Sequence, residues 1–290
     1  MVRHGAEPGD GVVTAQRLAP SPRQGTRQGW SPRRRQRVSR GVQYALLIAV
    51  VAVLASLADW KSIHQSFFNG QVAADGLPRL FTVALKNTVI YTACGYVVGF
   101  ALGMLLALMR QSSVAPYRWI ASTYIEIFRG LPALVIFLMI GSLPLAFPGL
   151  RIPGDVYGQV TLGLGLVSAA YMAETFRAGL QAVPRGQMEA ARSLGMPYMR
   201  SMVSIIIPQA VRIVIPPLTN QLVLLFKDSS LVLFLGLTAA QVELAKFGND
   251  QASTFANPTP ILVSGLTYLL ITIPLGYVAR RLESRQEGKR

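Results

Sequence analysis

Opposite charges stand three residues apart at several places in this largely apolar sequence. The pairs are Glu126 with Arg129, Glu174 with Arg177, and Glu189 with Arg192. Residues at this spacing are neighbours on a helix surface, where a carboxylate and a cation can neutralise each other or face a charged solute. Lys227 and Asp228 are adjacent instead, so on a helix their side chains diverge and each needs another partner. These charges indicate ion pairing or solute binding.

Catalytic and metal chemistry find little support in the sequence. His4 and His64 are the two histidines, and one lies in an N-terminal tail and the other in a loop. Cys94 is the single cysteine and lies in an apolar run, which excludes a disulfide framework or a cysteine-rich metal site. The sequence contains no Gly-x-x-x-x-Gly-Lys-Ser/Thr loop for binding ATP. We therefore expect a protein that is not an enzyme and has no cofactor of its own.

The composition predicts a membrane protein. Hydrophobic residues make up 51% of the 290 residues and charged residues 14%, and the mean hydropathy is +0.40. This balance is unusual for a soluble domain. The net charge of +15 could suggest nucleic acid, but the basic residues flank apolar runs instead of interleaving with aromatic residues on a globular face. We expect an all-α transmembrane protein whose partner is membrane lipid and not nucleic acid.

Apolar runs of roughly the length that a bilayer requires predict about six spanning helices. Their expected ranges are 41–59, 80–109, 119–147, 160–176, 209–226 and 261–279. Residues 1–40 are rich in Arg, Pro, Gly and Ser and predict a disordered basic tail. Between the spans we expect a polar linker at 61–79, an external loop at 248–260, and a partly helical connection at 231–246 whose depth in the membrane stays open.

Glycine and proline predict how some of the spans pack and bend. Gly95, Gly99 and Gly103 recur every fourth residue and would form one smooth ridge that lets a neighbouring helix approach closely. Gly130 and Pro132 predict an interruption near the start of the third span, and Pro216-Pro217 predict a break or kink in the fifth.

The distribution of cations predicts the orientation. With six spans, twenty-one Lys and Arg residues fall on the side that holds both ends of the chain, and six fall on the other side. By the positive-inside rule the N- and C-termini are cytosolic, and so is the loop at 184–208.

The loop at 184–208 is a polar island between two spans. Pro184 can open a short helix there, and Gly195 followed by Pro197 can close it. A second segment from Tyr198 is expected to end at Pro208. A helix, an elbow and another helix suit docking into the groove of a partner, and an ordinary loop helix is the alternative.

The loop at 184–208 resembles the EAA loop of membrane subunits of bacterial ABC importers. The residues that carry the resemblance are Glu189, Ala190, Ala191, Gly195 and Pro208. At Ile207 the family pattern more often has Leu, and the exchange keeps the apolar bulk. The resemblance implies that a separate ATP-binding ABC subunit docks on this loop, and that ATP and Mg²⁺ are bound by that subunit.

Three further stretches resemble permeases for polar amino acids. They are residues 126–132, where Leu131 replaces the commoner Thr, residues 169–174, and residues 220–231. The resemblance covers 80–282, implies a five-helix type I importer core there, and leaves the first span as an addition. The candidates that it offers for the substrate path are Glu126, Arg129, Glu174, Asn220, Lys227 and Asp228.

The resemblance implies import of polar amino acids across the bacterial plasma (inner) membrane by alternating access. The implied partners are the ABC subunit, an extracytoplasmic substrate-binding protein and a second permease chain, identical or related. An ion-coupled secondary carrier and a membrane channel or scaffold are the alternatives. The carrier is disfavoured because Glu126 and Glu174 lie near span ends instead of at mid-membrane.

Overall fold

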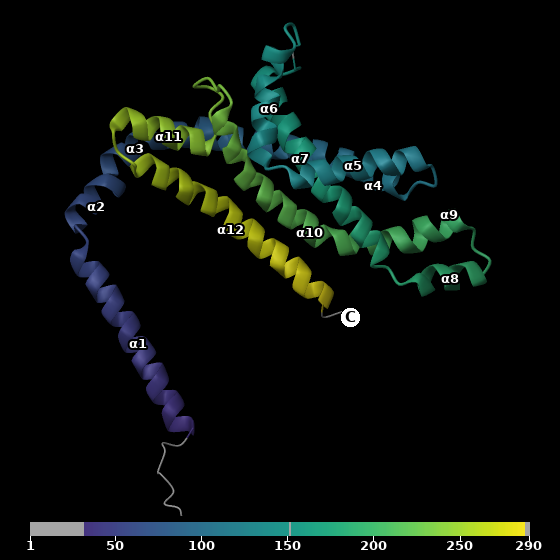
Figure 1. Cartoon of the computed structure of the whole chain (residues 1–290), viewed down its shortest axis with the longest axis horizontal. Helices are drawn as coiled ribbons and strands as arrows, with labels where there is room; N and C mark the ends of the chain where they lie inside the picture. The colour runs from purple at the N-terminus through teal and green to yellow at the C-terminus, as the bar shows by residue number, and fades with distance from the viewer. Residues whose placement is uncertain (1–31, 151, 288–290) are drawn as a thin grey trace, which may run out of the picture. The chain divides into compact units, whose positions relative to one another are not determined.

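A computed structural model describes residues 32–150 and 152–287, and their regular structure is helical throughout (Figure 1). The helices are α1 (Pro32–Leu57), α2 (Trp60–Phe67), α3 (Gly70–Arg79), α4 (Lys86–Gln111), α5 (Ala115–Gly130), α6 (Ala133–Ala146), α7 (Asp155–Gln181), α8 (Arg185–Ser193), α9 (Tyr198–Ser201), α10 (Ile207–Asp228), α11 (Leu244–Phe255) and α12 (Thr259–Glu287). Two π-helical segments, Leu80–Leu85 and Met202–Ile206, and a 3₁₀ segment, Ser229–Phe234, lie between them. The predicted all-α class is confirmed.

The chain divides into two compact units, Met1–Ala58 and Asp59–Arg290. The described part of the first unit is essentially helix α1, which begins at Pro32, so residues 32–40 are helical although we assigned them to the disordered tail. The reason is local: Pro suits the first turn of a helix, and the Arg-rich residues after it are good helix formers that continue into the apolar run. The remainder of the predicted tail, 1–31, lies outside the described residues.

Helices α4 and α7 pack along the predicted glycine ridge, which the structure confirms. A Cβ atom added at Gly95 would lie 2.5 Å from Leu164 Cβ, one at Gly99 would lie 1.9 Å from Ser168 Oγ, and one at Gly103 would lie 2.8 Å from Met172 Cβ. Real Cβ atoms do not approach so closely, so only glycine allows this packing. The residue numbers rise together along the two helices in these three contacts, so α4 and α7 run in the same direction.

The parallel course of α4 and α7 bears on how the membrane is crossed between them. Five helices are long and apolar enough to span, and α5 with α6 form a further apolar pair bent by 106°. A chain that leaves α4 on one side must return to the opposite side before it can begin a parallel α7. The pair α5–α6 is therefore a broken sixth span, interrupted at Leu131 and Pro132 as the sequence predicted.

Two segments that we expected to be irregular are helical. The predicted linker at 61–79 forms α2 and α3, because the side chains of Asp59 and Asn69 accept hydrogen bonds from backbone N–H groups of the first turn of each helix, at 3.1–3.3 Å. The segment 248–260, predicted as a loop, is helical as far as Phe255 for the same kind of reason, since Glu243 caps α11.

Two other prolines or proline pairs, Pro208 and Pro216-Pro217, do not end the helices that contain them. The segment from Tyr198 does not stop at Pro208 but continues as one membrane-spanning helix to Phe234. The π-helical segment Met202–Ile206 shifts the hydrogen-bond register just before Pro208, which accommodates a residue without an N–H. Helix α10 also continues through Pro216-Pro217, where it packs against α7 and α12.

We predict that Gly99→Leu separates α4 from α7 and lowers the stability of the chain. The added side chain would overlap Ser168, and overpacking of this kind costs about 1–3 kcal/mol or more. The thermal midpoint of the detergent-purified chain measures the effect. Gly265→Leu on α12 is the matched control, because a Cβ there meets nothing within 4 Å. Equal midpoints for the two variants would contradict this account of the α4–α7 contact.

Candidate functional site

Glu174 on α7 is the centre of a charge cluster. Its Oε1 forms an ion pair with Nη1 of Arg110 on α4, and its Oε2 accepts hydrogen bonds from Arg177 Nη2 at 2.6 Å and Nε at 3.0 Å. Arg129, in the last turn of α5, places Nη1 4.0 Å from Glu174 Oε1. The expected pair Glu174–Arg177 is confirmed. The cluster gathers three guanidinium groups around one carboxylate and is therefore net positive.

Arg129 is the least engaged cation of the cluster. Its side chain is 44% exposed, against 25% for Arg110 and 30% for Arg177. It lies over the ring of Tyr171, with its Cζ atom 5.7 Å from the ring centroid. Arg177 makes one more hydrogen bond, because it also donates to Gln181 Oε1 at 2.7 Å. Arg129 is thus the guanidinium that a solute can reach.

A pocket of about 420 Å³ opens beside this cluster. Arg129 and Glu174 supply its charges, Thr175 a hydroxyl, and Gly179 with Pro217 of α10 part of its wall. Gly179 is required there, because a Cβ would lie 2.1 Å from Val214. The pocket has the size and the mixture of apolar and charged groups that suit a small polar solute.

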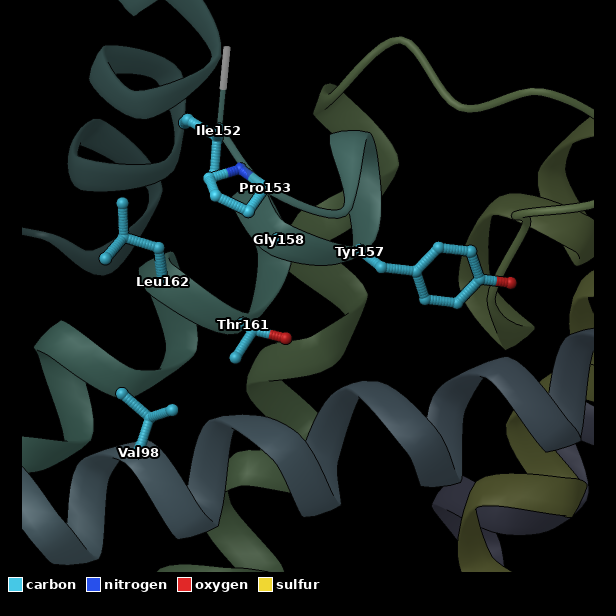
Figure 2. A pocket seen from close by; sticks show the side chains of 7 residues that line it. All are labelled: Val98, Ile152, Pro153, Tyr157, Gly158, Thr161 and Leu162. Carbon is cyan, nitrogen blue, oxygen red and sulfur yellow. The ribbon is translucent and has the colours of Figure 1, made fainter.

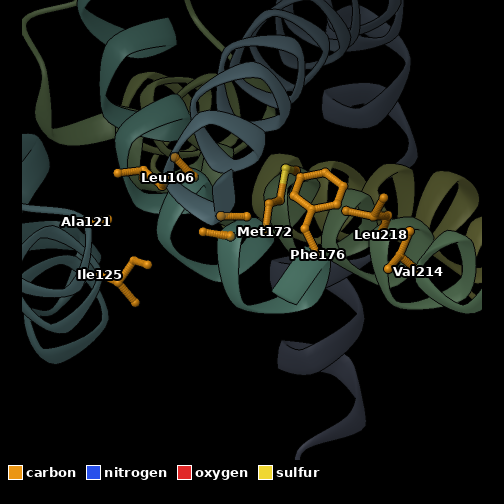
Figure 3. Close-up of a cluster of buried hydrophobic side chains, with 10 residues drawn as sticks. Leu106, Ala121, Ile125, Met172, Phe176, Val214 and Leu218 are labelled. Carbon is orange, nitrogen blue, oxygen red and sulfur yellow. The ribbon is translucent and has the colours of Figure 1, made fainter. Parts of the chain in front are cut away.

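A buried apolar cluster fixes the direction in which Glu174 points. Met172 and Phe176, which flank Glu174 on α7, pack with Leu106 of α4, Ile125 of α5 and Leu218 of α10 (Figure 3). Phe176 also makes an edge-to-face contact with Phe100, with ring centroids 5.1 Å apart. Because neighbouring residues of α7 are locked by this packing, the carboxylate between them turns toward Arg110 and Arg129.

The other predicted path residues lie apart from this pocket. Glu126 is exposed on α5, and among the described residues no ion pair within 4.0 Å includes it, so the expected Glu126–Arg129 pair is wrong: Arg129 turns toward Glu174. Asn220 and Lys227 are exposed along α10, and Asp228 is half-buried at its end. None of the four lines the pocket at Glu174.

A second pocket, of about 390 Å³, lies between α4 and the start of α7 (Figure 2). It is lined by Val98, Ile152, Pro153, Tyr157, Gly158, Thr161 and Leu162. No charged side chain is among these residues, and the Tyr157 hydroxyl is committed to Asn87 Oδ1 at 2.9 Å. This pocket lacks the groups that would bind a charged amino acid.

The predicted loop helix is α8, and a Schellman motif closes it. Gly195 has φ +81°, its N–H donates to the carbonyl of Arg192 at 3.0 Å, and the N–H of Met196 donates to the carbonyl of Ala191 at 3.1 Å. Ala191 is buried beneath the helix, whereas Glu189 and Ala190 are exposed. Leu194 is 84% exposed, so an apolar side chain stands at the tip of the loop.

Comparison with known proteins identifies the family. Residues 99–288 match the family described as the binding-protein-dependent transport system inner membrane component. The chain belongs to this family of ABC transporter permeases. It is accordingly a multi-pass subunit of the inner membrane and not an enzyme: a separate ATPase binds and hydrolyses ATP, and the transport system includes a substrate-binding protein.

Individual relatives span most of the chain. A probable glutamine ABC transporter permease of Bacillus subtilis (strain 168) is 39% identical over 202 residues, which is 69% of this chain and 90% of that protein. An arginine transport system permease of Corynebacterium glutamicum is 35% identical over 250 residues, 80% of this chain and 75% of that protein. In the crystal structure of an amino acid ABC transporter with histidines, one chain matches with a TM-score of 0.67 at 33% identity, over 75% of this chain and 98% of that one.

Sequence reasoning missed two charged residues that the structure brings into long-range contacts, Arg110 and Glu243. Arg110 was counted only as a cytosolic cation, because nothing local links it to Glu174, which lies 64 residues away. Glu243 was not singled out, although an acidic residue just before a helix is a capping signal that could have drawn attention to it.

We predict that Glu174→Gln destabilises the chain. Its removal leaves Arg110 and Arg177 without a counter-charge in a partly buried site, which costs up to about 3 kcal/mol. The thermal midpoint in detergent is the measurement, and Glu126→Gln is the control because that carboxylate is exposed. A Glu174→Gln protein as stable as the control would show that the cluster contributes no net stability.

Proposed function

We propose that this chain is the permease subunit of an ATP-driven importer of polar amino acids. The observation that carries the proposal is its family membership together with relatives, matched over most of the chain, whose names specify glutamine, arginine and glutamate/aspartate. These side chains differ in charge, so the relatives support the class of polar amino acids and not one member of it. Every amino acid shares an α-carboxylate that a guanidinium can bind.

In this proposal, the pocket beside Glu174 is part of the substrate path. Arg110 and Arg177 already neutralise Glu174, which leaves Arg129 to accept the carboxylate of the amino acid. Glu174 and the apolar wall at Pro217 then face the rest of the solute. Glu126, Asn220, Lys227 and Asp228 stay candidates for other positions along the path.

We propose that the loop at 184–208 transmits conformational changes of the ATPase to the membrane-spanning helices. Glu189, Ala190 and Ala191 form the middle of α8, and Gly195 ends it in a left-handed conformation that other residues adopt at a cost. Pro208 lies beyond it, in the first turn of α10. Gln209 Nε2 of α10 lies 3.5 Å from Gln187 Oε1 of α8. A displacement of α8 would therefore also move α10.

Alternating access requires a second permease chain, identical or related, which we propose as a partner. The permease domain would be residues 80–282, with 41–59 as an added span and 1–40 as a cytosolic tail. Rotation of α7 and α10 as rigid bodies would then open the path alternately to the two sides.

A transport assay in proteoliposomes tests the function. We expect ATP-dependent uptake of labelled glutamine, arginine or glutamate, with little uptake of leucine. Uptake should stop when ATP is depleted and survive an uncoupler, whereas an ion-coupled carrier would show the reverse. Absence of any flux would favour a channel or scaffold.

The same assay tests the role of Arg129. We expect Arg129→Gln to raise the KM for the transported amino acid by about tenfold or more, because a charge-assisted hydrogen bond to the carboxylate is lost. Lys61→Gln, at an exposed cation of α2 outside the pocket, should leave the KM unchanged. Equal KM values for the two variants would place the substrate elsewhere.

Co-purification tests the coupling loop. We expect Glu189→Lys to leave the amount of chain in the membrane unchanged but to abolish recovery of the ATPase, since the reversed charge disrupts the docking face of α8. Glu283→Lys, an equivalent reversal at an exposed position near the end of α12, should retain the ATPase. Full ATPase recovery with the Glu189→Lys chain would refute the coupling role.

A further inference from the structure

Glu243 is a fully buried carboxylate that neither the substrate pocket nor the coupling loop uses. Its exposed fraction is 0%. As the N-cap of α11 it accepts hydrogen bonds from the backbone N–H groups of Ala245 and Lys246, both at 2.6 Å. The phenol of Tyr268 on α12 donates to its Oε2 at 2.8 Å. Glu243 therefore ties the start of α11 to α12.

The carboxylate of Glu243 has no cation to neutralise it within ion-pair distance among the described residues. The nearest candidate on its own helix, Lys246, forms an ion pair with Asp250. The other titratable groups that interact with Glu243 are the phenols of Tyr268 on α12 and Tyr91 on α4, which are neutral donors. Lys246 therefore acts on Glu243 only as a nearby charge and not as an ion-pair partner. A buried carboxylate without an ion pair is costly to ionise, and the group readily takes up a proton instead.

The segment that contains Glu243 joins four helices at one end of the bundle. Four hydrogen bonds link α4 to its backbone: Asn87 Nδ2 donates to the carbonyls of Ala240 and Val242, both at 2.9 Å, Tyr91 donates to the carbonyl of Gln241 at 2.8 Å, and Leu244 N–H donates to Thr88 Oγ1 at 3.1 Å. Asn87 Oδ1 also accepts a hydrogen bond from Tyr157 of α7. Residues 240–246 thus connect α4, α11 and α12 directly, and α7 through Asn87 of α4.

We propose that Glu243 is a proton-responsive positioning residue of the transport cycle, whose protonation state sets how firmly residues 240–246 are held between α4 and α12. The distribution of cations places this end of the bundle on the outer side of the membrane. The group would therefore respond to the pH outside the cell, while the ATPase works at the pH of the cytosol.

The direction of the response follows from the burial of Glu243. Burial raises the pKa of its carboxyl from 4.5 to about 7, although the hydrogen bonds from Ala245, Lys246 and Tyr268 and the positive charge of Lys246 act in the opposite sense. The packed arrangement thus favours the protonated form. External acid stabilises the contact of residues 240–246 with α4 and α12, and external base loosens it, which allows the helices to move past one another.

The decisive experiment uses the chain reconstituted with its ATPase in proteoliposomes. Only complexes whose ATPase faces outward hydrolyse added ATP, so the side with Glu243 faces the vesicle lumen, whose pH is set by the trapped buffer. We expect ATP hydrolysis at a lumenal pH of about 8.5 to exceed that at about 5.5 by roughly fivefold or more, the lower end of typical coupling between distant sites. The external pH stays constant, so the ATPase itself is not titrated.

Glu243→Gln, which keeps the shape of the side chain but cannot ionise, should abolish this dependence on lumenal pH. Asp75→Asn, at an exposed carboxylate of α3, is the matched control and should keep it. Tyr268→Phe removes a hydrogen bond that lowers the pKa of Glu243, so the midpoint of the profile should move to higher pH. A Glu243→Gln complex that retains the wild-type profile would overturn the proposal.

The thermal midpoint of the chain alone provides a second readout that needs neither ATPase nor substrate. Because the pKa of Glu243 is raised in the folded chain, its contribution to the free energy of unfolding is present below about pH 4.5 and is lost as the pH rises to about 7. The midpoint of the wild-type chain should therefore fall across this window relative to that of Glu243→Gln. Parallel curves for the two proteins would also overturn the proposal.

Discussion

The close approach of α4 and α7 is the contact on which the rest of this permease depends. Three glycines of α4 meet Leu164, Ser168 and Met172 of α7 at distances that leave no room for a Cβ atom. Helices in lipid gain no hydrophobic free energy by associating, so such van der Waals contact is a main source of their affinity. The same parallel packing brings Arg110 to Glu174 at one end and Asn87 to Tyr157 at the other.

The carboxylates near the two ends of this helix pair, Glu174 and Glu243, have different electrostatic environments. At one end Glu174 is surrounded by three arginines, so the charges beside the pocket are net positive. At the other end Glu243 accepts hydrogen bonds from neutral donors and forms no ion pair among the described residues, although the charge of Lys246 lies near it. A charge that is paired stays ionised, whereas one that is merely hydrogen-bonded in a dry site is easily neutralised. In the proposals above, one end binds the solute and the other responds to protons.

Local sequence patterns predicted the family and most of the spans. They failed where the structure depends on contacts between residues that are distant in the sequence. The EAA pattern around Glu189 and the ridge at Gly99 depend on spacing within one segment, so the sequence showed them directly. The Glu126–Arg129 pair was wrong because Arg129 finds Glu174, on another helix. The expected stop at Pro208 was wrong because the chain forms a π-helical segment before it. The caps at Asp59 and Asn69 were local signals that the prediction of a linker overlooked.

The sequence by itself determined that the chain spans a membrane, and it predicted which way the chain faces and which loop meets the ATPase. Apolar length, the asymmetry of cations and a short motif are properties of neighbouring residues. Only the tertiary structure decided that α5 and α6 form one broken span, that Arg110 shares Glu174, and that Glu243 is buried. The physical reason is that burial and charge pairing depend on which helices touch. In lipid that choice is made by the fit of helix surfaces and not by hydrophobicity, which is nearly uniform along the spans.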